Sequence, residues 1–179
     1  SQIFVRGGVA GTEPRIMRHG ERVGVIVVNW NSGDLLLPCV ESIAGQTIAP
    51  ERVLIVDNAS TDGSLGDLEE RFPQVEVLRQ PVNRGFACGN NIAIEKLVDV
   101  DWIALLNPDA IAYPDWLENL LASARQHPTV VSFGSKMLRP GSDVLDGTGD
   151  VYHVSGLAWR RDHGAKDTLV DHGVDKIFS

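Results

Sequence analysis

Seven side chains with ligand-binding chemistry follow short apolar runs of this 179-residue sequence. In chain order they are Asn29, Trp30, Asn31, Asp57, Arg84, Asn107 and Asp109. A carboxylate accepts hydrogen bonds from the N–H groups of a flat heterocycle, an indole offers a ring face, and a guanidinium holds phosphate oxygens. One carboxylate beside an amide is too small a ligand set for a metal site made by protein alone, but Mg²⁺ commonly binds through one or two carboxylates plus ligand phosphates. The residue types therefore favour a nucleotide ligand.

Each of these residue types also has a purely structural interpretation. Asn, Asp, Ser and Gly are preferred in strand-to-helix turns, so Ser60 and Asp62 are interpreted as caps rather than as ligands. Trp30 could equally pack in the interior, and Arg84 could be an ordinary surface arginine. Asp57 differs, because it stands directly at the predicted end of an apolar run.

Short β-branched runs alternate with longer amphipathic stretches from residue 23 onward, and Asp34 is expected to cap the first helix. The pattern predicts strands at 23–28, 53–56, 75–78, 102–106 and 130–137, and helices at 34–46, 61–71, 86–98 and 114–126. Successive strand-then-helix units are typical of an α/β fold with a mostly parallel sheet and helices on both faces. In such sheets ligands bind outside the carboxyl ends of the strands, where the candidate side chains stand.

The two ends of the chain lack this alternation. Residues 1–22 are rich in glycine and aperiodic, which predicts a linker without chemistry. Turn-forming residues dominate 140–150, strand-like pieces return at 151–159, and the stretch from 160 to 179 is polar and aperiodic. Because no closing helix follows, we expect the domain to be truncated at its carboxyl end.

Composition excludes several classes of function. With 16 basic against 24 acidic residues and no basic cluster, a general nucleic-acid surface is excluded, and the apolar runs are too short for a transmembrane segment. Cys39 and Cys88 lack the spacing of a zinc site, which favours a reducing, cytoplasmic compartment. Without paired histidines, a nucleophile elbow or a dinucleotide fingerprint, zinc-enzyme, hydrolase and dinucleotide-binding functions are disfavoured.

Four segments of the sequence together resemble motifs of family 2 glycosyltransferases with the GT-A fold. They occur in the same order as in that family. They are VIVVNWN at 25–31, IVDNASTDGS at 55–64, NRGFACGNN at 83–91 and LLNPDA at 105–110. The rhamnosyltransferase-like subgroup is the most similar part of the family. The combination of four motifs is specific, whereas any one of them alone is not.

The resemblance implies a role for each residue that matches a family motif. Asn29, Trp30 and Asn31 correspond to the segment that lines the base and ribose of the nucleotide. Asp57 corresponds to the aspartate that reads a pyrimidine base, and Arg84 to an arginine near the base and diphosphate. These implications agree with the chemistry of the side chains themselves.

Asn107, Pro108 and Asp109 occupy the position of the family's Asp-x-Asp motif. The resemblance therefore implies that Asp109 binds a divalent metal ion, Mg²⁺ or Mn²⁺. Asn107 is a departure, because many members carry an aspartate there. The neutral amide weakens the expectation of high metal affinity.

The family likeness also implies a reaction and a domain organisation. Residues 23–139 are expected to bind a nucleotide sugar, and residues 140–179 to begin an acceptor-side region that is incomplete. The expected reaction transfers a sugar, such as rhamnose or another deoxysugar, from a dTDP- or UDP-linked donor to a hydroxyl of a saccharide or lipid-linked acceptor, with inversion. The expected setting is cell-surface polysaccharide synthesis in the cytoplasm, at the inner face of the membrane.

The catalytic base of this family normally follows far downstream, and no such acidic motif is found before Ser179, so the base is expected beyond Ser179. Asp146 and Asp150 are the weak candidates within the sequence, although turn formation also explains them. A nucleotide-sugar-binding module without catalysis is therefore an alternative. A nucleotidyltransferase is a more distant one, because residues 30–34 lack the basic side chains that a triphosphate-binding loop needs.

Overall fold

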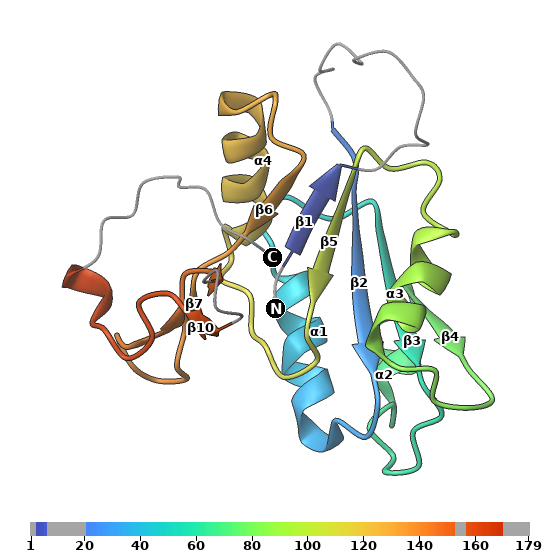
Figure 1. Ribbon diagram of the computed structural model, residues 1–179. Helices are drawn as coiled ribbons and strands as arrows, with labels where there is room; N and C mark the ends of the chain where they lie inside the picture. Colours follow the sequence, from blue (N-terminus) through green and yellow to red (C-terminus); the bar gives the residue numbers. More distant parts are fainter. Residues whose placement is uncertain (1–2, 7–20, 153–156, 170–179) are drawn as a thin grey trace. The chain divides into compact units, whose positions relative to one another are not determined.

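The computed structural model describes residues 3–6, 21–152 and 157–169, which divide into two compact units at residues 132 and 133. The strands of the first unit are β1 (Ile3–Arg6), β2 (Val23–Asn29), β3 (Arg52–Asp57), β4 (Val75–Arg79), β5 (Trp102–Leu106) and β6 (Ser132–Gly134), the last of which crosses the division. Its helices are the 3-10 turn η1 (Gly33–Leu35), α1 (Leu36–Ala44), α2 (Leu68–Arg71), α3 (Phe86–Ile94) and α4 (Trp116–Gln126). Figure 1 shows these elements along the chain.

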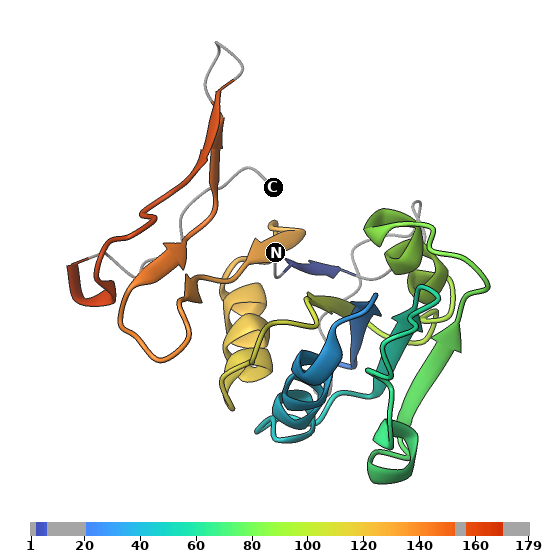
Figure 2. The ribbon, with the colours of Figure 1, turned by 90° about the horizontal axis from the view of Figure 1, so that it is seen from below.

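One six-stranded sheet organises the first unit, in the order β4-β3-β2-β5-β1-β6. The central strand β2 pairs in parallel with β3 and with β5, and β3 pairs in parallel with β4. Figure 2 shows α3 on one face of the sheet and α1 and α4 on the other. The predicted mostly parallel sheet with helices on both faces is confirmed.

The core explains why β2 is apolar along its whole length. All seven of its residues are buried, because helices cover both faces of the sheet. Ile26 and Val28 pack with Leu54, Val56 and the α3 side of the molecule. The opposite face of the sheet is covered by the buried residues of α1 and α4.

Helix α3 approaches the sheet unusually closely at Gly89. A Cβ atom at this position would lie 2.8 Å from Val28 Cγ1 and 3.4 Å from Asn58 Nδ2, so no larger side chain fits without displacement. The glycine therefore fixes how near the amino-terminal half of α3 lies to the ends of β2 and β3.

Strand β1 was not anticipated, since residues 1–22 were expected to be a linker. Residues Ile3–Arg6 pair antiparallel with β5, and the Phe4 ring stacks on Trp102 with centroids 4.7 Å apart. Phe4 is fully buried, so this short apolar run contributes to the core. Its partner strand lies about a hundred residues further along the sequence, a pairing that no local pattern reveals.

Three other local predictions differ from the structure. Residues 61–67 form turns, and only Leu68–Arg71 are helical, because Gly63 and Gly66 adopt positive φ angles of 76° and 38°. Asp34 makes no capping hydrogen bond to α1. The structure has two short strands, β6 and β7, in place of the single strand expected at 130–137, because the polar residues between them interrupt the strand.

The second unit contains β7 (Met137–Leu138), β8 (Leu145–Gly147), β9 (Asp150–Tyr152), β10 (Ala158–Arg160) and the 3-10 turn η2 (Asp167–Leu169). Strands β7 and β8 form one antiparallel pair, and β9 and β10 form another. The strand-like pieces predicted at 151–159 therefore correspond to β9 and β10 at both ends of that stretch, and residues 153–156 lie outside the described part of the chain. The division at 132 and 133 lies seven residues before the expected boundary at 139.

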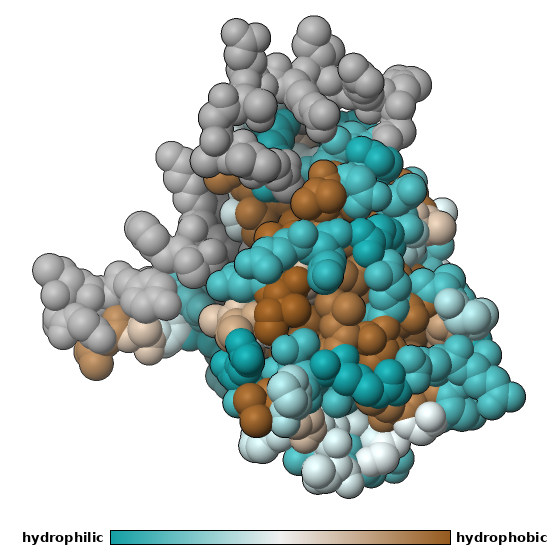
Figure 3. Space-filling model, turned by 90° about the vertical axis from the view of Figure 1, so that its right-hand side faces the viewer, coloured by the Kyte–Doolittle hydropathy of each residue, from teal (hydrophilic) through white to brown (hydrophobic). Residues whose placement is uncertain are grey.

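Surface properties of the described residues add two observations. Figure 3 shows hydrophobic surface between hydrophilic residues on the side where β4 and α3 lie. In α3 and the residues after it, Phe86, Ile94 and Val98 are exposed. No helix in the described part of the chain is long and apolar enough to cross a membrane.

Candidate functional site

The carboxyl ends of the parallel strands bring the candidate residues to one edge of the sheet. Asn29 at the end of β2 is in register with Asp57 at the end of β3, which is in register with Arg79 at the end of β4. On the other side of β2, the end of β5 leads directly into Asn107. The chain passes from β2 to β3 in one direction and reaches β5 in the other, so this edge contains the topological switch point where such sheets bind ligands. We call it the carboxyl edge.

Asn29 is the most deeply buried of these residues, with an exposed fraction of 0%. Its Nδ2 lies 2.8 Å from Asp57 Oδ1, 2.9 Å from Ser64 Oγ and 3.1 Å from Ser60 Oγ. Asp57, at 4% exposed, also accepts the Ser60 N–H through Oδ2 at 3.2 Å. The amide of Asn29 thus ties the end of β2 to the loop that follows β3.

Asn58 extends this network toward α3. Its backbone N–H donates to the Asn29 carbonyl at 2.9 Å, and its Nδ2 donates to the Gly85 carbonyl at 3.2 Å. The Oδ1 atoms of Asn29 and Asn58 are buried without a hydrogen-bond partner among the described residues. Two acceptors at the carboxyl edge are therefore unsatisfied, a costly arrangement that marks the edge as chemically unusual.

The loops after β2 and β3 are joined by side chains that cap backbone N–H groups. Ser60 Oγ accepts the Asn31 N–H at 3.0 Å, and Asn31 Oδ1 accepts the Thr61 N–H at 2.8 Å. Asn31 itself adopts a φ of 50°, which asparagine tolerates better than most residues. The interpretation of Ser60 as a capping residue is confirmed, since its hydroxyl oxygen accepts a backbone N–H.

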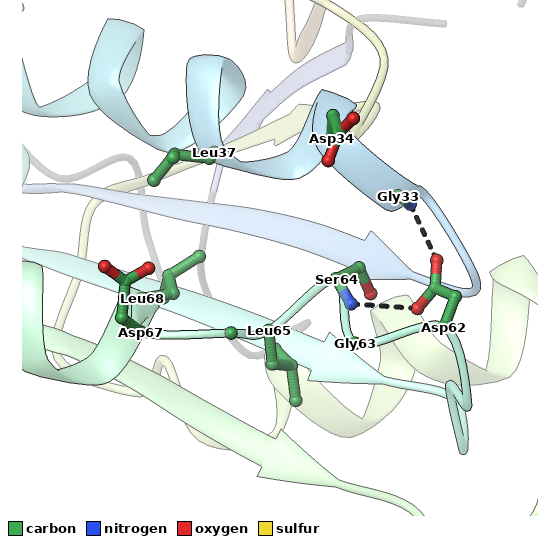
Figure 4. A pocket seen from close by; sticks show the side chains of 10 residues that line it. Gly33, Asp34, Leu37, Asp62, Gly63, Ser64, Leu65, Asp67 and Leu68 are labelled. Carbon is green, nitrogen blue, oxygen red and sulfur yellow. Dashed lines mark hydrogen bonds between the residues drawn. The ribbon is translucent and has the colours of Figure 1, made fainter.

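Asp62 has the same capping role in the turn that follows, as Figure 4 shows. Its Oδ1 accepts the Ser64 N–H at 3.0 Å and its Oδ2 accepts the Gly33 N–H at 2.7 Å. The hydrogen bonds from Ser64, and then that from Gly33, lower the pKa of this exposed carboxyl group. Beside it lies a hollow of about 270 Å³, lined by both loops and by the start of α1 and α2.

Trp30 is 57% exposed, so the interior packing role considered for it is wrong. Trp30 directly follows Asn29, the last residue of β2, and its exposed ring is accessible to a ligand. An exposed indole leaves apolar surface in contact with water, so a ligand that covers the ring gains free energy from burying that surface.

Arg84 is exposed just before α3. Its guanidinium has no hydrogen bond or ion pair with any residue that the structure describes. The next residue, Gly85, has a φ of 81° and donates its N–H to Asn83 Oδ1 at 2.7 Å. This turn presents Arg84 beside the first N–H groups of a nine-residue helix, which together can hold phosphate oxygens.

Asp109 lies in a turn that follows β5. The Ala110 N–H donates to the Asn107 carbonyl at 3.1 Å, which places Pro108 and Asp109 at the two central positions of a β-turn. The Cys39 thiol also donates to this carbonyl, with Sγ 3.4 Å from the oxygen. Burial, and to a lesser extent the negative charge of Asp109, raises the pKa of Cys39 to about 12, so the thiol remains a donor at neutral pH.

The donor set suits a metal ion that also binds a ligand. Asp109 is exposed, and the described residues contain no group of three or more His, Cys, Asp or Glu side chains that could hold a cation alone. Mg²⁺ and similar ions often use one or two carboxylates together with substrate phosphates. Asp109 therefore fits a divalent cation that is shared with a diphosphate.

The sequence profile of Glycosyl transferase family 2 matches residues 24–174, which is most of the chain. The chain belongs to this family. The resemblance inferred from its four motifs is thereby confirmed.

Relatives and solved structures of this family support the assignment. An N-acetylglucosaminyl-diphospho-decaprenol L-rhamnosyltransferase of Mycobacterium tuberculosis is 27% identical over 155 residues, which cover 76% of this chain and 50% of the relative. An Escherichia coli glycosyltransferase, YibD, is 30% identical over 112 residues, which cover 61% of this chain and 32% of the relative. The chain thus spans half or less of the length of these curated relatives.

Two solved structures show the same fold. S. aureus TarS 1-349 in complex with UDP-GlcNAc aligns with a TM-score of 0.54 at 23% identity, over 60% of this chain and 32% of that one. The mannosyltransferase PcManGT from Pyrobaculum calidifontis, in complex with GDP-Man and Mn²⁺, aligns with a TM-score of 0.52 at 26% identity, over 59% and 33%. The predicted GT-A fold is confirmed.

The two candidate bases of this family 2 chain lie in the second unit. Asp146 is on β8, where Arg160 and His163 contact its carboxylate, and Asp150 begins β9. Both residues are therefore in strands rather than in the turns that were expected. The Asp146 carboxylate already pairs with Arg160 at the surface, whereas no such partner is seen for Asp150 among the described residues.

The base expected beyond Ser179 is a different matter, because the described residues end at residue 169 and Ser179 itself lies outside them. The location of that base therefore stays a prediction, and the structure bears only on Asp146 and Asp150.

Sequence reasoning did not single out Ser64, which contacts Asn29, or the role of Cys39 beneath the Asn107 turn. Ser64 stands in a stretch that was predicted to be helical, so its hydroxyl was not expected to face β2. A cysteine within an amphipathic helix ordinarily indicates core packing, and only the fold shows which carbonyl it meets.

Proposed function

We propose that this chain carries the donor-binding side of a glycosyltransferase that moves a sugar from a nucleoside diphosphate sugar to an acceptor hydroxyl. The observation that supports this most is the carboxyl edge itself, where Asn29 and Asp57 meet in register and the turns with Arg84 and Asp109 follow neighbouring strands. Family membership supports the reaction type. The rhamnosyltransferase and the UDP-GlcNAc complex among the similar proteins are consistent with a nucleotide-sugar donor.

The base and ribose would bind at the ends of β2 and β3. Asp57 would accept an N–H of a pyrimidine ring, and Trp30 would cover the ring or the ribose with its exposed indole. Asp57 is 4% exposed and its Oδ2 accepts the Ser60 N–H, so binding of the base to Asp57 would require the segment around Ser60 to move. The donor is thereby proposed to be UDP- or dTDP-linked.

The diphosphate would lie between Arg84 and Asp109. Arg84 has a guanidinium without a partner among the described residues, and the first N–H groups of α3 lie beside it. Asp109 would hold Mg²⁺ or Mn²⁺ jointly with phosphate oxygens, and the cation supplies Lewis-acid stabilisation of the departing diphosphate. The positive charge of Arg84 would stabilise the same developing negative charge.

Transfer with inversion requires a carboxylate that removes the proton of the acceptor hydroxyl. Asp146 and Asp150 are the candidates that we propose within this sequence, with Asp150 preferred because Asp146 is held by Arg160. A deoxysugar and a saccharide or lipid-linked acceptor agree with the name of the mycobacterial relative, and we propose cell-surface polysaccharide synthesis as the setting. Both cysteines of the chain are unpaired, which is consistent with a reaction at the cytoplasmic face of the membrane.

A thermal-unfolding series with UDP, dTDP, GDP and ADP, each with Mn²⁺, tests the proposal. At about 100 times its dissociation constant, a bound nucleotide stabilises the fold by about 2.7 kcal/mol. We expect UDP or dTDP to raise the midpoint and ADP to have little effect. An equal response to ADP would remove the pyrimidine assignment, and the absence of any response would remove the donor site.

Two tryptophan variants provide a matched control for the same experiment. Trp30 and Trp159 are exposed to similar extents, 57% and 51%; Trp30 directly follows β2 at the carboxyl edge, whereas Trp159 is part of β10 in the second unit. Trp30→Ala should reduce the stabilisation by UDP, whereas Trp159→Ala should preserve it. Equal losses in both variants would contradict the placement of the base.

A further inference from the structure

Three polar side chains, on α1 and directly after it, contact the segment following β5. Cys39 and Ser42 are three positions apart on one face of α1, and Gln46 comes directly after Gly45, the C-cap residue of that helix. Figure 1 shows the segment after β5 passing along α1 before it reaches α4. We call these three residues the anchor face.

Ser42 and Cys39 bracket the turn that contains Asp109. Cys39 Sγ donates to the Asn107 carbonyl at 3.4 Å, two residues before Asp109. Ser42 Oγ accepts the Ala112 N–H at 3.0 Å, three residues after Asp109, and donates to the Cys39 carbonyl at 2.7 Å. Both backbone anchors of the Asp109 turn are thus supplied by α1.

Gln46 makes a third connection further along the same segment. Its Nε2 lies 2.8 Å from the Tyr113 carbonyl and 3.0 Å from the Ser42 carbonyl, and its Oε1 accepts the Leu117 N–H at 3.0 Å. The side chain is 9% exposed, so its hydrogen bonds form away from water. A buried amide with bonds to both of its polar atoms specifies one position for the segment that it holds.

The anchor face explains how an exposed carboxylate can have a defined position. Asp109 is exposed and its side chain makes no hydrogen bond with a described residue, so only its backbone can fix it. A metal-binding carboxylate must be held to within about half an ångström of its working geometry. A β-turn that is tied to a helix on both sides provides such a hold.

We propose that Ser42 and Gln46 are positioning residues for Asp109, which set the affinity of the carboxyl edge for a divalent cation with a bound diphosphate. The inference rests on the proposed function, because it assigns Asp109 to the cation. Residues that orient a metal ligand typically change metal affinity by about 10- to 100-fold when they are mutated. Neither residue contacts the cation in this proposal.

Titration of UDP into the full chain, with Mn²⁺ and with EDTA, tests the proposal. Ser42→Ala removes the acceptor of the Ala112 N–H, and Gln46→Glu retains the acceptor for Leu117 but loses both donated hydrogen bonds. Each variant should reduce the Mn²⁺-dependent gain in UDP affinity about tenfold, while affinity in EDTA is unchanged. Ser42→Thr retains a hydroxyl and should restore the gain.

The control is Ile43→Val, which removes one methylene from a buried side chain of the same helix. It should lower stability without changing the Mn²⁺-dependent gain, and an equal reduction in this variant would overturn the specific role of the anchor face. If Mn²⁺ strengthens UDP binding to the wild type and the gain is unchanged in Ser42→Ala and Gln46→Glu, the positioning role is overturned. The proposed function is then unaffected.

Amide hydrogen exchange separates this inference from the proposed function, because it needs no ligand. Ala112 should exchange faster in Ser42→Ala, and no change would overturn the proposed anchoring. If wild-type affinity for UDP is the same with Mn²⁺ and with EDTA, the metal component of the proposed function fails, and the role of the anchor face in cation affinity fails with it.

Discussion

Arg84 is exposed at the carboxyl edge, and no described residue neutralises its charge. A guanidinium about 4 Å from a phosphate charge interacts by about 4 kcal/mol at an effective dielectric constant near 20, before the cost of desolvation. Asp109 presents the opposite charge on the turn after β5. The Arg84 guanidinium can contact the phosphate oxygens of a diphosphate directly, and Asp109 can bind the same diphosphate through a shared divalent cation.

Arg84→Ala should weaken UDP about tenfold and uridine hardly at all, because only UDP carries the charge that Arg84 meets. Calorimetric titration of both ligands measures the difference. Arg71→Ala is the matched control, since Arg71 is an exposed arginine that already pairs with Glu41 at 2.6 Å. A similar loss for uridine would show that Arg84 does not act on phosphate.

The elements that carry the carboxyl edge differ in how well their sequences predict them. Residues 102–106 were predicted as a strand and form β5 with the same ends, because an apolar run lies between Asp101 and the turn-forming Asn107 and Pro108. The helix predicted at 61–71 begins only at Leu68, since Ser60 and Asp62 use their side chains to cap backbone N–H groups of the β2 loop. Local propensity gives no information on such contacts between loops.

The anchor face shows the same limit. Ser42 on α1 and Gln46 directly after it are ordinary polar residues of the stretch predicted as an amphipathic helix at 34–46, and by pattern alone both would be assigned to solvent. They are half-buried and buried because the segment after β5 folds back over them. The carboxyl-edge residues were identifiable because strand ends share an edge, whereas the residues that position them depend on tertiary packing.

Gly89→Ala tests the close approach of α3 to the sheet. The added Cβ would lie 2.8 Å from Val28 Cγ1, so we expect the free energy of unfolding to fall by about 1–3 kcal/mol, measured by urea denaturation. Gly45→Ala is the control, because its nearest contact is 3.4 Å. Equal stabilities of the two variants would contradict the packing described for α3.

Across the whole molecule, buried apolar side chains are concentrated in the first unit. Among the described residues of the second unit, only Phe133 and Leu145 belong to the buried apolar core. Two short antiparallel strand pairs and ion pairs such as Lys136 with Asp167 hold that unit. Surface ion pairs contribute little to stability, so this unit should open more readily than the sheet.

Amide hydrogen exchange followed by mass spectrometry measures that difference directly. Peptides from β2, β3 and β5 should exchange most slowly, and peptides from β7 to β10 should exchange substantially faster. Fast exchange requires opening of the hydrogen bonds, and the free energy of opening rises with the apolar area that covers them. Equal protection of the two units would show that the second unit shares the stability of the first.

Asp109 at the carboxyl edge is proposed to bind a divalent cation together with a nucleoside diphosphate. Calorimetric titration of UDP into wild type and Asp109→Asn, with Mn²⁺ and with EDTA, tests it most directly. Asp115→Asn is the control, since it removes an exposed carboxylate just before α4. We predict that Mn²⁺ strengthens UDP binding at least tenfold in wild type and Asp115→Asn but not in Asp109→Asn, which keeps its fold because residue 109 is exposed. The same Mn²⁺ dependence in all three proteins would show that Asp109 does not bind the cation and that Asn107, Pro108 and Asp109 form a turn alone.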